Sequence, residues 1–310
     1  MSTARRDAGV GVLFNPSMQQ FLSHYLHRLD YLAVIPDRGW IDHGKDRSPR
    51  FQLLPGVMTL LDCVARERPI VLHGIGLSIC SAEIFDKAYA QNLMEWAERF
   101  GSPWISEHLS FSRVGTAHEL NAGIMVPVPY DRDVLELLSS RVRCFTDRLN
   151  CPFLLENNVY YFDYPQQELS EEEFLNELCH RCGCGVLLDL HNLYTNSFNH
   201  GFSAIDFLDN LDLTNVAEVH IAGGAPMMGY HTDSHTGPVL EPVWVLLEHV
   251  APLATNLRGV TFEFHESSYA HLGEGGILEQ VERARAIVGV CHASLEPGSD
   301  VAAVVSTGGC

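Results

Sequence analysis

Short apolar runs alternate with amphipathic segments along most of the chain. The runs predict buried strands at Val10–Phe14, Tyr31–Ile35, Ile70–His73, Trp104–His108, Phe153–Glu156, Val186–Asp189, Ala217–His220 and Val260–Glu263. Apolar residues recur at helical spacing in Pro16–Leu29, Gly56–Glu67, Glu83–Phe100, Asp131–Leu149, Glu171–Cys182, Ser203–Leu211, Val239–Val250 and Gly276–Val288. Strands that alternate with helices predict βαβ units and a parallel sheet.

Local signals support two of these helices. Ser81 is a candidate N-cap for Glu83–Phe100, which ends before Gly101 and Pro103. Ser170 and Glu173 have the spacing of a capping box at the start of Glu171–Cys182.

Eight strand–helix pairs of roughly 35 residues favour a single closed (β/α)₈ barrel. A doubly wound open sheet is the structural alternative, but no G-x-G-x-x-G follows the first strand. We therefore predict one α/β barrel domain over residues 1–290. Residues 291–310 are rich in Ala, Val, Ser and Gly without periodicity, which predicts a loosely held tail.

Composition narrows the class of function. The 310 residues include 20 Lys and Arg against 39 Asp and Glu, a formal charge of −19, which disfavours nucleic acid as a partner. There is no apolar run of the roughly 18 to 20 residues that a membrane span needs, and no signal-peptide pattern follows Met1–Asp7. Nine scattered cysteines indicate reduced thiols. We expect a cytoplasmic protein without a membrane partner.

The ends of six consecutive predicted strands carry side chains that bind metals. These are His73, His108, Glu156, Asp189, His220 and Glu263, and Asn192, Asp233 and His235 lie just beyond strands six and seven. Any one of them could be a helix cap or a packed polar residue. Carboxylates gathered at one barrel mouth would repel each other, however, and cations would relieve that repulsion. The pattern therefore predicts a metal centre.

The ligand types limit the choice of metal. Imidazoles mixed with carboxylates, without thiolates, suit Fe, Mn or Zn rather than Mg or Ca. Their number exceeds the needs of one tetrahedral zinc, so at least two ions are expected, with Glu156 able to bridge them. The residues alone leave dinuclear zinc hydrolysis and dinuclear iron oxidation both open.

A set of short motifs resembles the DUF692 family, whose characterised members are multinuclear non-haem iron-dependent oxidases. The motifs are His73-Gly74-Ile75-Gly76-Leu77-Ser78, Ser106-Glu107-His108-Leu109, Leu155-Glu156-Asn157, Asp189-Leu190-His191-Asn192, His220-Ile221-Ala222-Gly223 and Asp233-Ser234-His235-Thr236-Gly237-Pro238-Val239. Their order and spacing hold from about Gly9 to Val288.

This resemblance implies a xylose-isomerase-like TIM barrel with two or three iron ions and O₂ as co-substrate. The substrate would be a ribosomally made precursor peptide, usually modified at Cys and sometimes at Asn or another C-terminal residue. A small partner protein would present it. The resemblance carries metal ligation over to His73, His108, Glu156, Asp189, Asn192, His220, Asp233, His235 and Glu263. All but Asn192 are also the expected catalytic residues.

The chain departs from the family's pattern around the barrel mouth. Glu107 replaces a usual Asp, Asn158 a frequent Pro, Gly224 a common second His and His265 a frequent Asp. Pro36-Asp37-Arg38-Gly39-Trp40 replaces the usual Glu-Asn stretch after strand two. No inferred ligand is lost, but these positions affect which substrate is bound.

Two other classes of function compete with the oxidase. One is a zinc- or manganese-dependent hydrolase or isomerase of the xylose-isomerase-like barrels, which include endonucleases, although the charge opposes a DNA substrate. The other is a non-enzymatic peptide-binding module, in which replacing His108 or Glu156 by Ala would leave biological activity intact.

The roles of several further reactive or aromatic residues depend on where the fold places them. Cys179, Cys182 and Cys184 precede strand six, which places them on the barrel face opposite the active site and favours a structural role. His200 and His231 are candidate proton donors or solvated loop residues. Tyr160, Tyr161 and Tyr194 follow strands five and six and either line a substrate groove or pack in the core.

Overall fold

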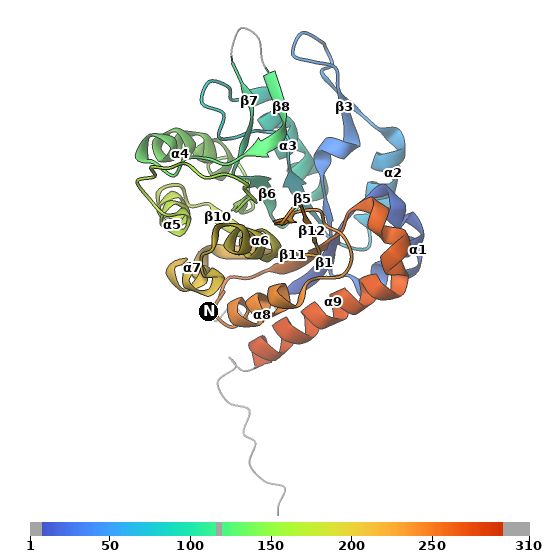
Figure 1. Ribbon diagram of the computed structural model, residues 1–310. Coiled ribbons are helices and arrows are strands. Elements are labelled where there is room, and N and C mark those ends of the chain that lie inside the picture. The colour runs from blue at the N-terminus through green and yellow to red at the C-terminus, as the bar shows by residue number, and fades with distance from the viewer. Residues whose placement is uncertain (1–7, 116–119, 294–310) are drawn as a thin grey trace, which may run out of the picture.

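The computed structural model describes residues 8–115 and 120–293, and its centre is a closed barrel of eight parallel strands (Figure 1). The strands are β1 (Gly9–Leu13), β2 (Tyr31–Val34), β5 (Ile70–Gly74), β6 (Ile105–His108), β9 (Phe153–Glu156), β10 (Gly185–Asp189), β11 (Val216–Ala222) and β14 (Gly259–Glu263). Each pairs with its neighbour in chain order, and β14 closes the barrel on β1. The predicted (β/α)₈ barrel is confirmed.

Helices surround this barrel. They are α1 (Gln19–Tyr25), α2 (Pro55–Val64), α3 (Lys87–Phe100), α4 (Arg132–Thr146), α5 (Glu171–Cys182), α6 (Leu190–His200), α7 (Ala204–Asn210), α8 (Glu241–Val250) and α9 (Tyr269–Ala293). Their apolar faces and the outer faces of the strands share one large buried core. The predicted capping box of Ser170 and Glu173 is present at the start of α5.

The helix boundaries correct the sequence prediction at two places. Helix α3 begins at Lys87 with Asp86 as its N-cap, because the Ser81 hydroxyl instead donates to the Arg113 carbonyl. Helix α6 was not predicted, because its Asn-, Ser- and Thr-rich sequence lacks a strong apolar stripe. Asp189, the last residue of β10, caps α6 by accepting from the Asn192 amide.

Three β-hairpins that the sequence did not predict follow barrel strands. They pair β3 (Trp40–Asp42) with β4 (Phe51–Leu53), β7 (Phe111–Val114) with β8 (Leu120–Val126), and β12 (Ala225–Met227) with β13 (Tyr230–Thr232). Figure 1 shows β3, β7 and β8 extending from the side of the molecule opposite α8 and α9. Because each hairpin follows the C-terminal end of a strand, together they surround the barrel mouth.

The barrel interior holds a small apolar cluster of mostly Leu, Ile, Val and Ala side chains, together with Tyr31 and Trp104. Tyr31 and Trp104 pack edge to face with ring centroids 5.2 Å apart. Gly259 makes room for both rings, because a Cβ there would lie 2.5 Å from the Tyr31 hydroxyl and 2.9 Å from Trp104. This layer closes the barrel from below and forms the floor under the mouth.

The predicted tail begins inside a helix, since α9 continues to Ala293, and residues 294–310 lie outside the described part of the chain. Within the described residues, no helix has the combination of length and apolar character needed to cross a bilayer. Cys179, Cys182 and Cys184 are buried in the core beside the start of β10, as the structural interpretation predicts.

Candidate metal centre

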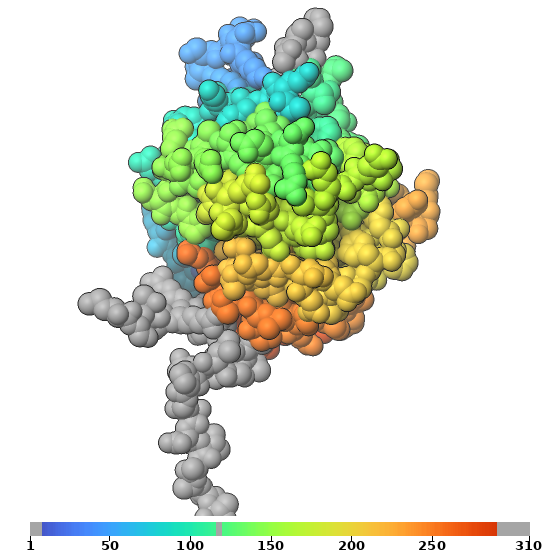
Figure 2. Space-filling view, turned by 90° about the vertical axis from the view of Figure 1, so that its left-hand side faces the viewer, coloured from blue at the N-terminus to red at the C-terminus, as the bar shows by residue number. Residues whose placement is uncertain are grey.

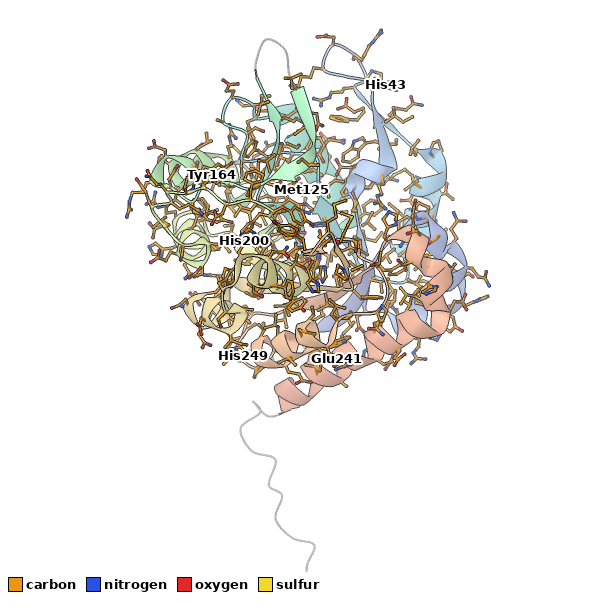
Figure 3. All side chains as sticks on the ribbon, in the orientation of Figure 1. His43, Met125, Tyr164, His200, Glu241 and His249 are labelled. Atoms are coloured by element: carbon orange, nitrogen blue, oxygen red, sulfur yellow. The ribbon has the colours of Figure 1, made fainter. Side chains whose placement is uncertain are left out.

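The structure brings all nine predicted ligands together at the C-terminal ends of the strands. A cavity of about 420 Å³ opens there, and Figure 3 labels Met125 of β8, one of its lining residues. His73, His108, Glu156, Asn192, Asp233, His235 and Glu263 line the cavity. Asp189 and His220 are fully buried behind them. Their role as ligands stays a prediction, but their convergence is a feature of the fold.

Glu156 lies at the centre of the cluster. Its Oε2 is 3.1 Å from His108 Nε2 and 3.4 Å from His73 Nε2, and its Oε1 is 3.8 Å from His220 Nδ1. Strand register explains the arrangement, because His108 and Glu156 are direct partners on β6 and β9. A carboxylate with three imidazole neighbours is well placed to bridge two ions.

A second group surrounds Glu263. Its Oε1 is 2.8 Å from His220 Nδ1 and its Oε2 is 3.4 Å from His235 Nε2. His235 Nε2 is also 2.7 Å from Asp233 Oδ1. Two carboxylates therefore meet on one imidazole nitrogen.

Four triads of donor atoms, each with all atoms within 4.8 Å of one another, overlap in this pocket. They are His73–His220–Glu263, His73–His108–Glu156, Glu156–Asp189–His220 and Asp189–His235–Glu263. Five residues belong to two triads each. This sharing of ligands is typical of clustered metal ions rather than of separate single sites.

Buried atoms without hydrogen-bond partners show that these residues fit metal ions. They are Glu156 Oε2, Asp189 Oδ2, Asn192 Oδ1, His220 Nδ1, Asp233 Oδ1, His235 Nε2 and Glu263 Oε1. Such atoms are costly to bury unpaired, and a bound cation would relieve that cost. His220 Nδ1 and Glu263 Oε1 lie 2.8 Å apart and belong to one donor triad, so both could bind the same cation.

The second nitrogen of each barrel histidine contacts a fixed partner. His73 Nδ1 is 3.0 Å from the Ser106 hydroxyl and His108 Nδ1 is 3.2 Å from the Gly74 carbonyl. His220 Nε2 is 3.3 Å from Glu218 Oε1. Contacts of this kind set the orientation of metal-binding imidazoles.

Glu218 contacts the candidate ligand His220, and sequence reasoning missed it. It is buried inside the barrel, where it accepts from Trp104 Nε1 and Thr261 Oγ1, both at 2.6 Å. Its place two residues before His220 puts both side chains on the inner face of β11. In the sequence, the only indication of this contact is the two-residue spacing between Glu218 and His220.

We expect Glu218→Gln to weaken metal binding about 10- to 100-fold, because His220 loses the carboxylate that orients it. The amide also leaves one buried donor without an acceptor, which costs about 1–3 kcal/mol of unfolding free energy. Metal titration and chemical denaturation of the same protein measure both effects. Unchanged metal affinity despite the lost stability would show that Glu218 only supports the core.

The loop after His73 is held by a buried acidic cluster outside the barrel. Three successive amides donate to it: Ile75 to Asp37 Oδ2, Gly76 to the Tyr89 hydroxyl, and Leu77 to Glu107 Oε2. The Tyr89 hydroxyl itself donates to Asp37. Burial and the nearby Asp37 raise the pKa of Glu107 well above its usual value. Glu107 and Asp37, both departures from the family's pattern, thus position the loop that carries His73.

Tyr89→Phe tests this arrangement. We expect a loss of about 1–3 kcal/mol, because the Gly76 amide loses its acceptor and Asp37 its donor. Chemical denaturation gives the loss, and hydrogen exchange at residues 74–78 should increase more than exchange in α8, which serves as an internal reference.

Asp189 and Asn192 are fixed by Asn157. Asn157 donates from Nδ2 to the Asp189 carbonyl and accepts at Oδ1 from the Asp189 amide. Asn192 donates from Nδ2 to the Asn157 carbonyl, which leaves its own Oδ1 unpaired. The Glu-Asn and Asp-x-x-Asn motifs therefore form one hydrogen-bonded unit. It holds the unpaired oxygens Asp189 Oδ2 and Asn192 Oδ1 at the pocket.

His191 lies beside the pocket, where Gly224 makes room for it. Its Nε2 is 3.9 Å from Asp233 Oδ1, and its Nδ1 is buried without a partner. A Cβ on residue 224 would lie 2.5 Å from the His191 ring.

The pKa values in the metal-free cluster are strongly perturbed. Burial raises the pKa of Glu156 well above its usual value and that of Asp189 to about 7, with neighbouring carboxylates adding to both shifts. Burial lowers the pKa of His108 to about 4. Although burial opposes it, the Asp233 carboxylate raises the pKa of His235 to about 10. Protons therefore take the place of cations when no metal is bound.

The tyrosines and histidines that the sequence offered as further candidates lie in different parts of the structure. Tyr161 lines the cavity, and its hydroxyl accepts from the Asp233 amide. His200 Nε2 is 3.0 Å from the Tyr160 carbonyl, and the two rings pack together. Tyr194 and His231 pack against each other on α6 and β13. His200 thus contacts the loop residue Tyr160, and His231 packs on helix α6. Neither histidine lines the metal pocket.

Solved structures with the same fold are distant in sequence. They include endonuclease IV from Thermus thermophilus (TM-score 0.55, 17% identity, covering 91% of this chain and 99% of that one). A xylose isomerase domain protein from Alicyclobacillus acidocaldarius gives a TM-score of 0.53 at 17% identity, covering 92% and 99%. These likenesses confirm the barrel fold.

Relatives found by sequence share a larger fraction of identical residues with this chain than these solved structures do. Proteins described as UPF0276 include one from Rhizorhabdus wittichii, 32% identical over 74% of this chain and 79% of its own length. One from Caulobacter vibrioides is 29% identical over 76% and 79%. One from Streptomyces avermitilis is 34% identical over 82% of this chain, which spans 53% of that longer protein. Residues 8–287 match the family described as RiPP precursor modification enzyme MbnB/TglH/ChrH, and this chain therefore belongs to that enzyme family.

Proposed function

We propose that this protein is a multinuclear iron-dependent oxidase that modifies a ribosomally synthesised precursor peptide with O₂, at a Cys residue. The observation that carries the proposal is the set of four overlapping His and carboxylate triads with unpaired buried donor atoms. Nitrogen and oxygen ligands without thiolate suit iron, and shared ligands suit two or three ions. Membership of a peptide-modifying family supports the substrate class.

His73, His108, Glu156, Asp189, Asn192, His220, Asp233, His235 and Glu263 would hold the iron. Iron bound there would supply one-electron redox chemistry and a site for O₂. Eight of the residues that line the cavity are apolar: Leu13, Phe14, Ile35, Ile75, Ile124, Met125, Val159 and Phe264. These side chains would surround the reacting residue of the peptide and exclude water from it.

The size of the cavity limits how much of the peptide can enter it. Its volume of about 420 Å³ admits a few residues of an extended peptide, while the remainder must lie on the surface around the mouth. A small partner protein that presents the peptide fits this division, because the barrel itself encloses so little of the substrate.

The test is metal analysis of protein produced with ample iron, followed by oxygen-consumption assays. We expect about two to three irons per chain and O₂ uptake only in the presence of the precursor peptide encoded beside the gene. Mass spectrometry should then locate the change on a Cys residue. Zinc alone, together with phosphoester hydrolysis or sugar isomerisation and no O₂ uptake, would instead support the hydrolase or isomerase.

A further inference from the structure

A second cavity, of about 330 Å³, lies beside the metal pocket. Its wall includes Tyr160, which directly precedes Tyr161 in the wall of the metal cavity. The first residues of α5 and α7 form its other sides. The face that these helices share with α4 is turned toward the viewer in Figure 2. Both cavities therefore open at the same end of the barrel, separated by one loop.

Four carboxylates line this second cavity without any cationic partner. They belong to Asp163, Glu171, Glu172 and Asp206, and no Lys, Arg or His among the residues that line the cavity is present to pair with them. No cation among the lining residues offsets Asp163, Glu172 and Asp206, so the cavity favours a cationic ligand.

Glu171 makes this more than a cluster of surface acids. The residue is only 8% exposed, and although its carboxyl group hydrogen-bonds with Tyr130, its Oε1 is buried without a partner. A buried carboxylate oxygen left unpaired costs free energy that a bound donor would recover. Burial raises the pKa of Glu171 to about 8, as expected of a carboxyl that has no cation beside it.

The remaining walls select the kind of cation. Tyr130, Tyr160, Phe202 and Phe207 supply aromatic surface, and Leu169 adds an apolar contact. A small metal ion gains nothing from such walls, whereas a planar guanidinium stacks on aromatic rings and donates to carboxylates in pairs. The composition of the cavity is therefore that of an arginine side-chain site.

We propose that this acidic pocket binds an arginine side chain of the peptide substrate and thereby positions the neighbouring reacting residue in the metal cavity. The substrate's identity as a peptide rests on the proposed function, but the affinity for a guanidinium does not. An arginine held beyond Tyr160 fixes the peptide's direction across the loop that separates the two cavities.

The first test uses N-acetyl-arginine N-methylamide as the probe, observed by saturation-transfer NMR with the whole protein. We expect saturable binding, and at least about tenfold weaker binding of the citrulline analogue, which has the same shape without the charge. The double variant Glu171→Gln with Asp206→Asn should lose this discrimination. Equal binding of both probes to the unaltered protein would overturn the proposal.

A matched variant separates the pocket from general electrostatics. Glu67→Gln with Glu98→Gln changes the net charge equally, at exposed positions outside this cavity. We expect it to bind the arginine probe as the unaltered protein does. An equal loss in both double variants would mean that the probe senses only the overall charge, which also overturns the proposal.

A second readout distinguishes this inference from the proposed function. With an active precursor peptide, the Glu171/Asp206 variant should raise KM about tenfold or more with kcat and iron content retained. Preserved guanidinium binding in a protein that never consumes O₂ would refute the oxidase and leave the arginine site standing. Loss of iron in the variant would instead show that these residues support the metal centre, contrary to the inference.

Discussion

Replacing Glu156 by Gln should remove at least one metal ion per chain and lower peptide-dependent O₂ uptake at least about 1,000-fold. Glu156 contacts His73, His108 and His220 and belongs to two of the four donor triads. Gln has nearly the same shape but no charge, so it cannot bridge two cations. Elemental analysis and oxygen-electrode assays check the two effects separately.

The same variant should have the opposite effect on the metal-free protein. Burial and neighbouring carboxylates disfavour the ionised form of Glu156, so its replacement by a neutral amide should leave the metal-free protein as stable as before or more stable. Asp86→Asn is the matched control, because Asp86 is a buried carboxylate that caps α3 and pairs with Arg50, away from the pocket. It should lose stability and keep its metal. A metal content in Glu156→Gln equal to that of the unaltered protein would contradict the central role of this residue.

Removal of the metal should lower the melting temperature by about 6–16 °C per site at neutral pH. A ligand present at 100 to 1,000 times its Kd stabilises the folded state by about 3–4 kcal/mol per site, and a chain of this size responds with roughly 2–4 °C per kcal/mol. Calorimetry before and after dialysis against a chelator measures the shift. Restoring the original melting temperature with ferrous iron controls for irreversible damage.

The drop in melting temperature on removal of the metal should grow as the pH rises from 6 to 8. In the metal-free protein the pKa of Asp189 is raised to about 7, so the stability linked to its proton is complete below its unfolded pKa and is lost as the pH rises through 7. His235, with its pKa raised to about 10, extends the decline to higher pH. The pKa of His108 is instead lowered to about 4. A lowered histidine pKa reduces stability only as the pH falls below the pKa of that histidine in the unfolded chain.

Metal binding must displace these protons, so metal affinity should rise over the same interval. Calorimetric titration in buffers of different ionisation enthalpy gives the number of protons released. A melting-temperature difference that stays constant between pH 6 and 8 would contradict the protonation of Asp189.

The alternation of apolar and amphipathic segments determined the barrel. Every barrel strand and all eight predicted helical segments overlap an observed element. For the strands, burial on both faces imposes a continuous apolar pattern. Helix α6 escaped prediction because its first turn carries ligands and their supports rather than a core stripe. The hairpins escaped it because their short strands are mostly exposed and therefore carry no burial pattern.

The nine candidate ligands could be named from the sequence because the topology of a parallel barrel sends every strand end to one mouth. Which of them share a cation depends on strand register and side-chain direction, and these are set by packing between strands far apart in the chain. Only the tertiary structure placed Glu156 opposite His108, set Glu218 behind His220, and put His191 in the space above Gly224. The acidic pocket beside Tyr160 likewise arises from the N-terminal ends of two helices, and no single segment of the sequence records their approach.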